Sequence, residues 1–157
     1  MKKRTGSPWI PAPAYGALLP QFTVNLIVRD IDAALAFYRQ IFDFTLRAQR
    51  PGNAFIELGD QFINMMEVKT PHQDGRRHFG LVVDDRSSVR ARVEAAGGKL
   101  VPGPFLDFLD PWGNRVEVVD YDNIQFTKAP QVLRAMGLDL DKNESARREL
   151  AAKGMLP

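Results

Sequence analysis

Few residues in this chain are suited to chemistry, and one of them, His78, opens the segment RRHFGLVVDD. It is one of two histidines, and the sequence contains no cysteine. Disulfides, thiolate metal sites and cysteine nucleophiles are therefore excluded. An imidazole at the start of a strand-like run can bind a metal, transfer protons or hold a purely structural hydrogen bond. What the sequence says about function depends on which of these roles His78 has.

The segment that contains His78 repeats the plan of an earlier one. FTVNLIVRDIDAALAFYRQIF begins with a run rich in Val, Ile and Leu and continues with apolar residues at helical spacing, and HFGLVVDDRSSVRARVEAAGG does the same. Asp30 and Asp85, 55 residues apart, each stand where a helix cap is expected. The common offset predicts two copies of one strand–helix unit.

Shorter apolar runs follow each predicted helix. They are AFIELG and FINMMEV in the first half, and PFLDFLD and NRVEVVDY in the second. Each half is therefore expected to be a βαβββ module, and the fold class is α+β. The modules span residues 22–68 and 77–121 of one domain, residues 22–121.

Two segments of different character flank this domain. Residues 1–21 contain four prolines and predict an extended N-terminal arm. Residues 122–157 predict a helical C-terminal extension, with Pro130 fitting the first position of a short helix and Gly137 its end, and with Gly154 ending a second helix. The extension is expected either to cover the chain's own sheet or to contact a partner.

The composition is that of an ordinary globular protein, with 45% hydrophobic and 25% charged residues. A formal charge of +2 gives no indication of a nucleic-acid partner. No apolar run approaches the ~20 residues that a membrane helix needs, so no membrane contact is expected and the cytoplasm is the expected location. The sequence has no phosphate loop or dinucleotide fingerprint.

Three segments, VNLIVRDIDAALAFYRQIFDF, HFGLVVDD and FLDPWGNRVEVVDY, resemble the vicinal oxygen chelate superfamily. This superfamily includes glyoxalase I, bleomycin-resistance proteins, extradiol dioxygenases and methylmalonyl-CoA epimerase. The resemblance implies that the two modules form an open cup-shaped sheet with helices outside, and that the chain forms a homodimer. Because the fold hosts many chemistries, the resemblance does not select an activity.

The resemblance also implies four metal-ligand positions, on the first and last strand of each module. They fall on Thr23, Asn64, His78 and Glu117. The second module keeps the His and Glu usual in the family, whereas Thr23 and Asn64 are poor ligands for zinc or iron. We therefore expect no metal cofactor. The alternative is a divalent metal ion held by His78 and Glu117.

Without a metal, two interpretations of His78 and Glu117 stay open. If they occupy neighbouring strands, the carboxylate can orient the imidazole for general acid–base catalysis. The pair can equally be structural, with no chemistry. His78 and Glu117 are the catalytic candidates.

Alternation along the predicted strands separates an apolar face from a mixed one. A concave surface that is partly apolar with a few polar groups is typical of small-molecule sites. Aromatic walls for this surface are expected from Phe55, Phe108 and Trp112. The residues expected to contact a ligand are Thr23, Asn25, Phe62, Asn64, Met66 and Arg115.

Three functions follow from these patterns. The first is a glyoxalase- or bleomycin-resistance-like protein that binds a small organic molecule in the cup, with a metal site degraded by Thr23 and Asn64. The second is a metal-dependent lyase, isomerase or dioxygenase that uses His78 and Glu117. The third is a regulatory or partner-binding protein that acts through its C-terminal helices.

Overall fold

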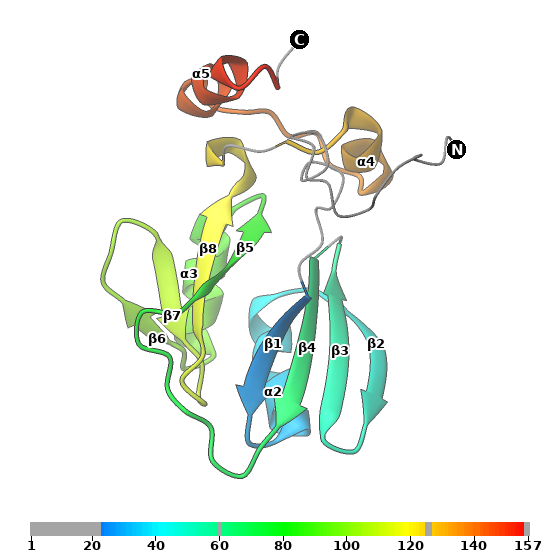
Figure 1. Ribbon diagram of the computed structural model, residues 1–157, viewed down its shortest axis with the longest axis vertical. Helices are drawn as coiled ribbons and strands as arrows, with labels where there is room; N and C mark the ends of the chain where they lie inside the picture. Colours follow the sequence, from blue (N-terminus) through cyan, green and yellow to red (C-terminus); the bar gives the residue numbers. More distant parts are fainter. Residues whose placement is uncertain (1–22, 60, 125–126, 156–157) are drawn as a thin grey trace, which may run out of the picture.

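The computed structural model describes residues 23–59, 61–124 and 127–155, so the predicted N-terminal arm lies outside it. The first module contains β1 (Thr23–Val28), α2 (Ile31–Ile41), β2 (Thr45–Arg50), β3 (Asn53–Leu58) and β4 (Gln61–Glu67). The second contains β5 (Phe79–Val83), α3 (Arg86–Ala95), β6 (Lys99–Val101), β7 (Leu106–Leu109) and β8 (Arg115–Asp120). Three short helices follow: η1 (Tyr121–Asn123), α4 (Pro130–Ala135) and α5 (Glu144–Ala152) (Figure 1).

Each module forms its own four-stranded mixed sheet. The strand orders are β1-β4-β3-β2 and β5-β8-β7-β6. In each sheet the first and last strands of the module pair in parallel, and the other pairs are antiparallel. The α+β class and the two βαβββ modules are confirmed.

The predicted caps form as the repeat indicates. The Asp30 carboxylate accepts a hydrogen bond from the Ala33 N–H at 2.8 Å, and the Asp85 carboxylate accepts one from the Ser87 N–H at 2.9 Å. Each satisfies a free donor in the first helical turn. Helix α3 ends before Gly97, which has a φ of +79° that only glycine adopts without strain.

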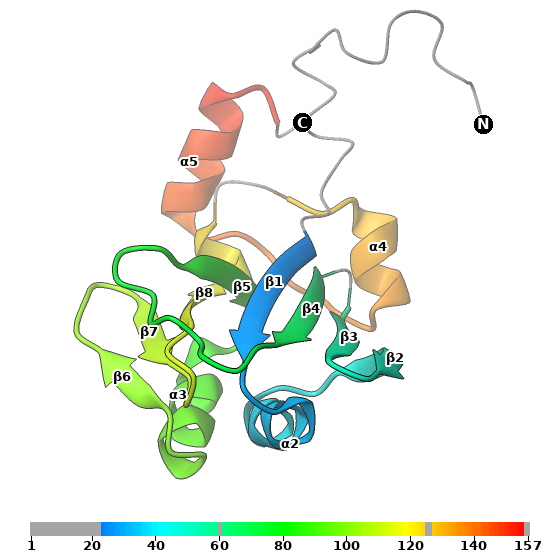
Figure 2. The ribbon, with the colours of Figure 1, turned by 60° about the horizontal axis from the view of Figure 1, so that its bottom comes forward.

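The two long helices lie on the same side of the sheets (Figure 2). The strand residues that face them are apolar and buried, as Leu26, Met65, Leu81 and Val118 illustrate. This confirms the predicted apolar face. We call the opposite surface of each sheet its cup face, and it carries the polar residues.

Side-chain amides join the two sheets in a pseudo-symmetric way. The Gln61 amide accepts from the N–H of Val82 at 2.9 Å and donates to its carbonyl at 3.0 Å. The Asn114 amide makes the same two contacts with Ile27, at 3.2 and 3.0 Å. Since Ile27 and Val82 occupy equivalent positions in the repeat, each module clamps the outer edge of the other module's first strand.

A buried node holds the Asn114 clamp in place. The Tyr38 hydroxyl donates to the Asp110 carboxylate at 2.9 Å, and the same carboxylate accepts from the Trp112 and Asn114 N–H groups. Burial raises the pKa of the Asp110 carboxyl above its ordinary value. Burial, together with the neighbouring Asp110, raises the pKa of Tyr38 well above its ordinary value. Helix α2 of the first module is thereby tied to a turn of the second.

The C-terminal extension packs on the end of β8. The Lys142 ammonium donates to the Tyr121 carbonyl and lies 3.4 Å from the centroid of the Tyr121 ring. Helix α5 buries Ala146 and Leu150. Helix α5 contacts η1, directly after β8, and the two predicted roles of the extension both stay open. Within the described residues, no helix is long and apolar enough to cross a membrane.

Candidate functional site

The site residues predicted from the sequence lie on the two cup faces. Strand register places Asn25, Asn64 and Phe55 side by side across β1, β4 and β3. In the second module the corresponding row is Gly80, Glu117 and Asp107. The two faces thus have the same backbone plan but different side-chain chemistry.

His78 and Glu117 are in contact, as the sequence led us to expect. The imidazole Nε2 lies 2.9 Å from the Glu117 Oε2, and Nδ1 lies 3.2 Å from the Arg76 carbonyl oxygen. The side chain of His78 is 40% exposed and that of Glu117 is 17% exposed. The imidazole is therefore the accessible member of the pair.

Arg115 is part of a second ion pair on this face. Its Nε donates to the Asp107 Oδ2 at 2.8 Å, its Nη2 donates to the same oxygen, and its Nη1 donates to the Gly75 carbonyl at 3.4 Å. The other carboxylate oxygen of Asp107 is buried and has no hydrogen-bond partner among the described residues. The guanidinium, which we expected to contact a ligand, is thus already held by Asp107.

An amide ladder, Asn53–Asn64–Asn25, crosses the cup face of the first module. Asn53 Nδ2 donates to both the Asn64 Oδ1 and the Met65 carbonyl oxygen, and Asn64 Nδ2 donates to the Asn25 Oδ1 at 2.8 Å. The sequence did not single out Asn53 on this face or Asp107 on the cup face of the second module. Alternation along β3 puts Asn53 on the same face as Phe55. Its contact with Asn64, however, follows from the register between β3 and β4, which alternation does not give.

The aromatic residues divide between the two sides of the sheets. Phe55 and Phe62 stack on the cup face with ring centroids 5.6 Å apart. Phe108 is fully buried in the core, and Trp112 packs edge-on against Phe37 of α2. The expectation that Phe108 lines the cup is wrong, and Trp112 packs toward helix α2.

Two further expected ligand contacts have different surroundings. Met66 is 41% exposed on β4 and is accessible to a ligand. The backbone of Thr23 pairs with Phe62 at the start of β1, while its side chain is outside the described part.

The four positions implied as metal ligands do not fit a metal ion. They belong to separate sheets, and the described residues contain no group of three or more His, Cys, Asp or Glu side chains able to hold one. The Asn64 oxygen already accepts from Asn53, and both nitrogens of His78 have partners. Among the described donor atoms at these positions, the Asn64 oxygen, both His78 nitrogens and one Glu117 oxygen are in contact with protein groups.

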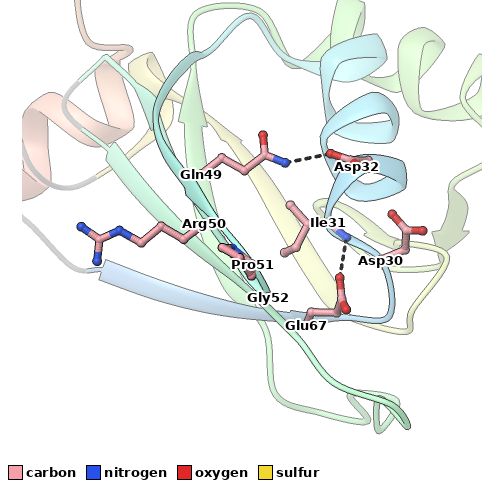
Figure 3. A pocket seen from close by; sticks show the side chains of 8 residues that line it. All are labelled: Asp30, Ile31, Asp32, Gln49, Arg50, Pro51, Gly52 and Glu67. Carbon is pink, nitrogen blue, oxygen red and sulfur yellow. Dashed lines mark hydrogen bonds between the residues drawn. The ribbon is translucent and has the colours of Figure 1, made fainter.

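One pocket lies elsewhere, at the amino end of α2 (Figure 3). It measures about 560 Å³, and a smaller one of about 420 Å³ occupies the equivalent place beside α3. In the first, Asp32 accepts from Gln49 at 2.8 Å, and Glu67 accepts from the Ile31 N–H at 3.3 Å. These carboxylates complete the local structure and give no sign of a ligand.

Solved structures of similar fold include a fosfomycin resistance protein and a lactoylglutathione lyase. The fosfomycin resistance protein FosX from Listeria monocytogenes, complexed with Mn(II) and sulfate, has a TM-score of 0.57 and 18% identity, over 73% of this chain and 95% of that one. Lactoylglutathione lyase from Agrobacterium tumefaciens has a TM-score of 0.50 and 25% identity, over 63% and 91%. No curated protein matches the sequence.

The sequence itself matches one family model. The model is that of the Glyoxalase/Bleomycin resistance protein/Dioxygenase superfamily, and the match spans residues 20–118, from before β1 into β8, the last strand of the second module. With the repeated fold and the paired His78 and Glu117, this match shows that the chain belongs to the Glyoxalase/Bleomycin resistance protein/Dioxygenase superfamily.

Proposed function

We propose that this chain binds a small organic molecule on its cup faces without a tightly held transition metal. One observation carries the proposal: Asn64, His78 and Glu117, the described residues at the family's ligand positions, contact other protein groups. Asn64 lies within the amide ladder, and His78 lies between Arg76 and Glu117. A site with two strong ligands at most seldom retains a catalytic metal, since catalytic zinc usually has three.

The exposed imidazole of His78 is the group best placed to meet a ligand on the second module. Glu117 fixes its orientation at 2.9 Å, and Arg115 and Asp107 hold the neighbouring surface. A second candidate, acid–base turnover of the bound molecule by His78 and Glu117, is favoured by the same contact, because an oriented imidazole beside a carboxylate can transfer protons.

A screen of small molecules tests the proposal. Ligand-detected NMR on a chemically diverse fragment library is run with the wild type, with His78→Ala and with the control His72→Ala, whose residue is exposed in the loop between the modules. We expect the affinity of the hits to fall about tenfold in His78→Ala, because one hydrogen bond to a partly buried charged pair is lost. We expect the same hits to bind His72→Ala unchanged. Identical hits in all three proteins would contradict the role of His78.

We also propose that the chain forms a homodimer, as its family membership suggests. In a single chain every residue of the edge strand β2 is exposed, and so are Asn25 and Met66 on the cup face. A second copy of the chain could bury exposed surface at strand β2 and on the cup face. Light scattering at micromolar concentration is expected to give twice the mass of the chain, and a monomer would contradict this proposal.

A further inference from the structure

The direction of the amide ladder is fixed at one end by the backbone. Asn53 donates to the carbonyl oxygen of Met65 at 3.1 Å, and a carbonyl can only accept. The nitrogen of Asn53 must therefore point toward β4, where it also donates to the oxygen of Asn64. This leaves the Asn64 nitrogen to donate to Asn25 at 2.8 Å. The orientation of all three amides follows from one main-chain group.

A consequence of this direction appears at the far end of the ladder. Because the Asn25 oxygen accepts from Asn64, the Asn25 nitrogen is the end of the ladder that remains for a ligand. Asn25 is exposed on β1, the edge strand of its sheet. Hydrogen bonds in a chain polarise one another, which strengthens the terminal donor. The face of the first module thus offers an oriented N–H group.

The side chains nearest this donor on β1, β3 and β4 are mainly apolar or amide groups. Phe55, directly beyond Asn64 in the register, stacks on Phe62. On the described cup-face side chains of β1, β3 and β4 the one charged residue is Glu57, which pairs with Arg47 at 2.9 Å, and on β2 Arg50 stands opposite Asn53, at the other end of the ladder from Asn25. A surface of this kind desolvates a neutral planar molecule at little cost but disfavours an ion.

We infer that the cup face of the first module recognises an uncharged, planar organic molecule through an acceptor atom, a carbonyl oxygen or a ring nitrogen, that accepts from Asn25. Asn53 is the positioning residue, because it sets the direction of the ladder without contacting the ligand. The inference rests on the proposed small-molecule function and specifies its chemical class. That class differs from the sulfate and the phosphonic acid bound by the FosX structures.

Four small probes separate the possibilities. Quinoline is a neutral ring acceptor, indole is a neutral ring donor of similar size, and benzoate and benzylammonium carry opposite charges. Nitrogen-15 NMR follows the side-chain amide of Asn25 during titration of each probe. We expect quinoline to shift this signal and to bind at least about fivefold more tightly than the other three, the effect of one matched hydrogen bond.

Three variants test the assignment to the ladder. Asn25→Ala is expected to lower quinoline affinity about fivefold. Asn123→Ala, which removes an exposed amide from the helical extension, is expected to leave it unchanged. Asn53→Asp replaces the donor with an acceptor of the same shape, so Asn64 and Asn25 should both turn over. The variant is then expected to prefer indole to quinoline, and thermal melts confirm that it is folded.

Several results would overturn the inference. Tighter binding of benzoate or benzylammonium would do so, as would an unchanged preference in a folded Asn53→Asp variant or the absence of any shift at Asn25. Fragments that bind at His78 but not at Asn25 would leave the proposed function in place while ruling out this ligand class. If Asn25→Ala changes the mass by light scattering and not the affinity, a second copy of the chain covers this face.

Discussion

The two modules share one backbone plan and differ most where they face away from the helices. At equivalent positions, the first module has Asn64 where the second has Glu117, and Phe62 where the second has Arg115. The apolar sides, by contrast, are alike, because both must pack under a helix. The comparison indicates that the apolar side of the strands specifies this fold, while the cup faces have diverged in chemistry.

The clamps between the modules provide the largest effect that we predict. Asn114→Ala removes a buried amide that contacts Ile27 and Asp110, and we expect it to lower the free energy of unfolding by about 2–3 kcal/mol. Gln61→Ala removes the equivalent but less buried clamp and is expected to cost about 1 kcal/mol.

Urea denaturation measures both losses on the same scale. Equal losses, or a greater loss in Gln61→Ala, would show that the buried node around Asp110 adds nothing to the second module's clamp. No loss in either variant would mean that the sheets are held together by other contacts.

The cup faces themselves are expected to matter far less for stability. Glu117→Gln removes the charge that pairs with His78. Because the side chain of His78 is partly exposed, we expect the free energy of unfolding to change by at most about 1 kcal/mol. Asn64→Leu breaks the ladder but keeps the Asn53 contact with Met65, and its cost is expected to be about 1 kcal/mol.

These two variants are compared by thermal and urea denaturation with the clamp variants. If Glu117→Gln or Asn64→Leu proved as damaging as Asn114→Ala, the cup faces would be structural surfaces and the case for a ligand would weaken.

The C-terminal extension gives the modules another difference, since α5 contacts η1, which directly follows β8 of the second module. Burial lowers the pKa of Lys142 to about 8 from its ordinary 10.5. Between these values the unfolded chain binds more protons than the folded one, so the folded state gains stability as the pH rises through that window. Lys142→Met keeps an apolar stem in the same place and lacks this gain.

The expected change in the free energy of unfolding with pH is small. From pH 8 to 10.5, the wild type should gain stability relative to Lys142→Met in parallel urea titrations. Two curves that stay parallel over this range would mean that Lys142 titrates alike in the folded and unfolded chain.

The sequence identified most of this architecture because the signals were local. Asp30 and Asp85 cap their helices, and the 55-residue offset located both modules. Strand β2 went unnoticed because all six of its residues are exposed, so it shows no apolar run, and β6 has only three residues.

The site was predictable as far as the family resemblance and alternation reach. The resemblance assigned His78 and Glu117 to the first and last strands of one module, and alternation put Asn25 on the cup face, but neither fixed the phase of PFLDFLD. Pairing with β8 puts Asp107 on the cup face and Phe108 in the core. The partner of Asn53 was equally hidden, because β3 and β4 meet in a register that the sequence does not show.

A manganese titration tests the central claim most directly. Free Mn(II) gives an electron paramagnetic resonance signal that falls when the ion binds, and the wild type is compared with His78→Ala. Because the Asn64 oxygen and both nitrogens of His78 are already engaged, we predict that the signal falls no further with the wild type than with the variant. Stoichiometric loss of the signal in the wild type, absent in His78→Ala, would show that the cup holds a metal and would contradict the account.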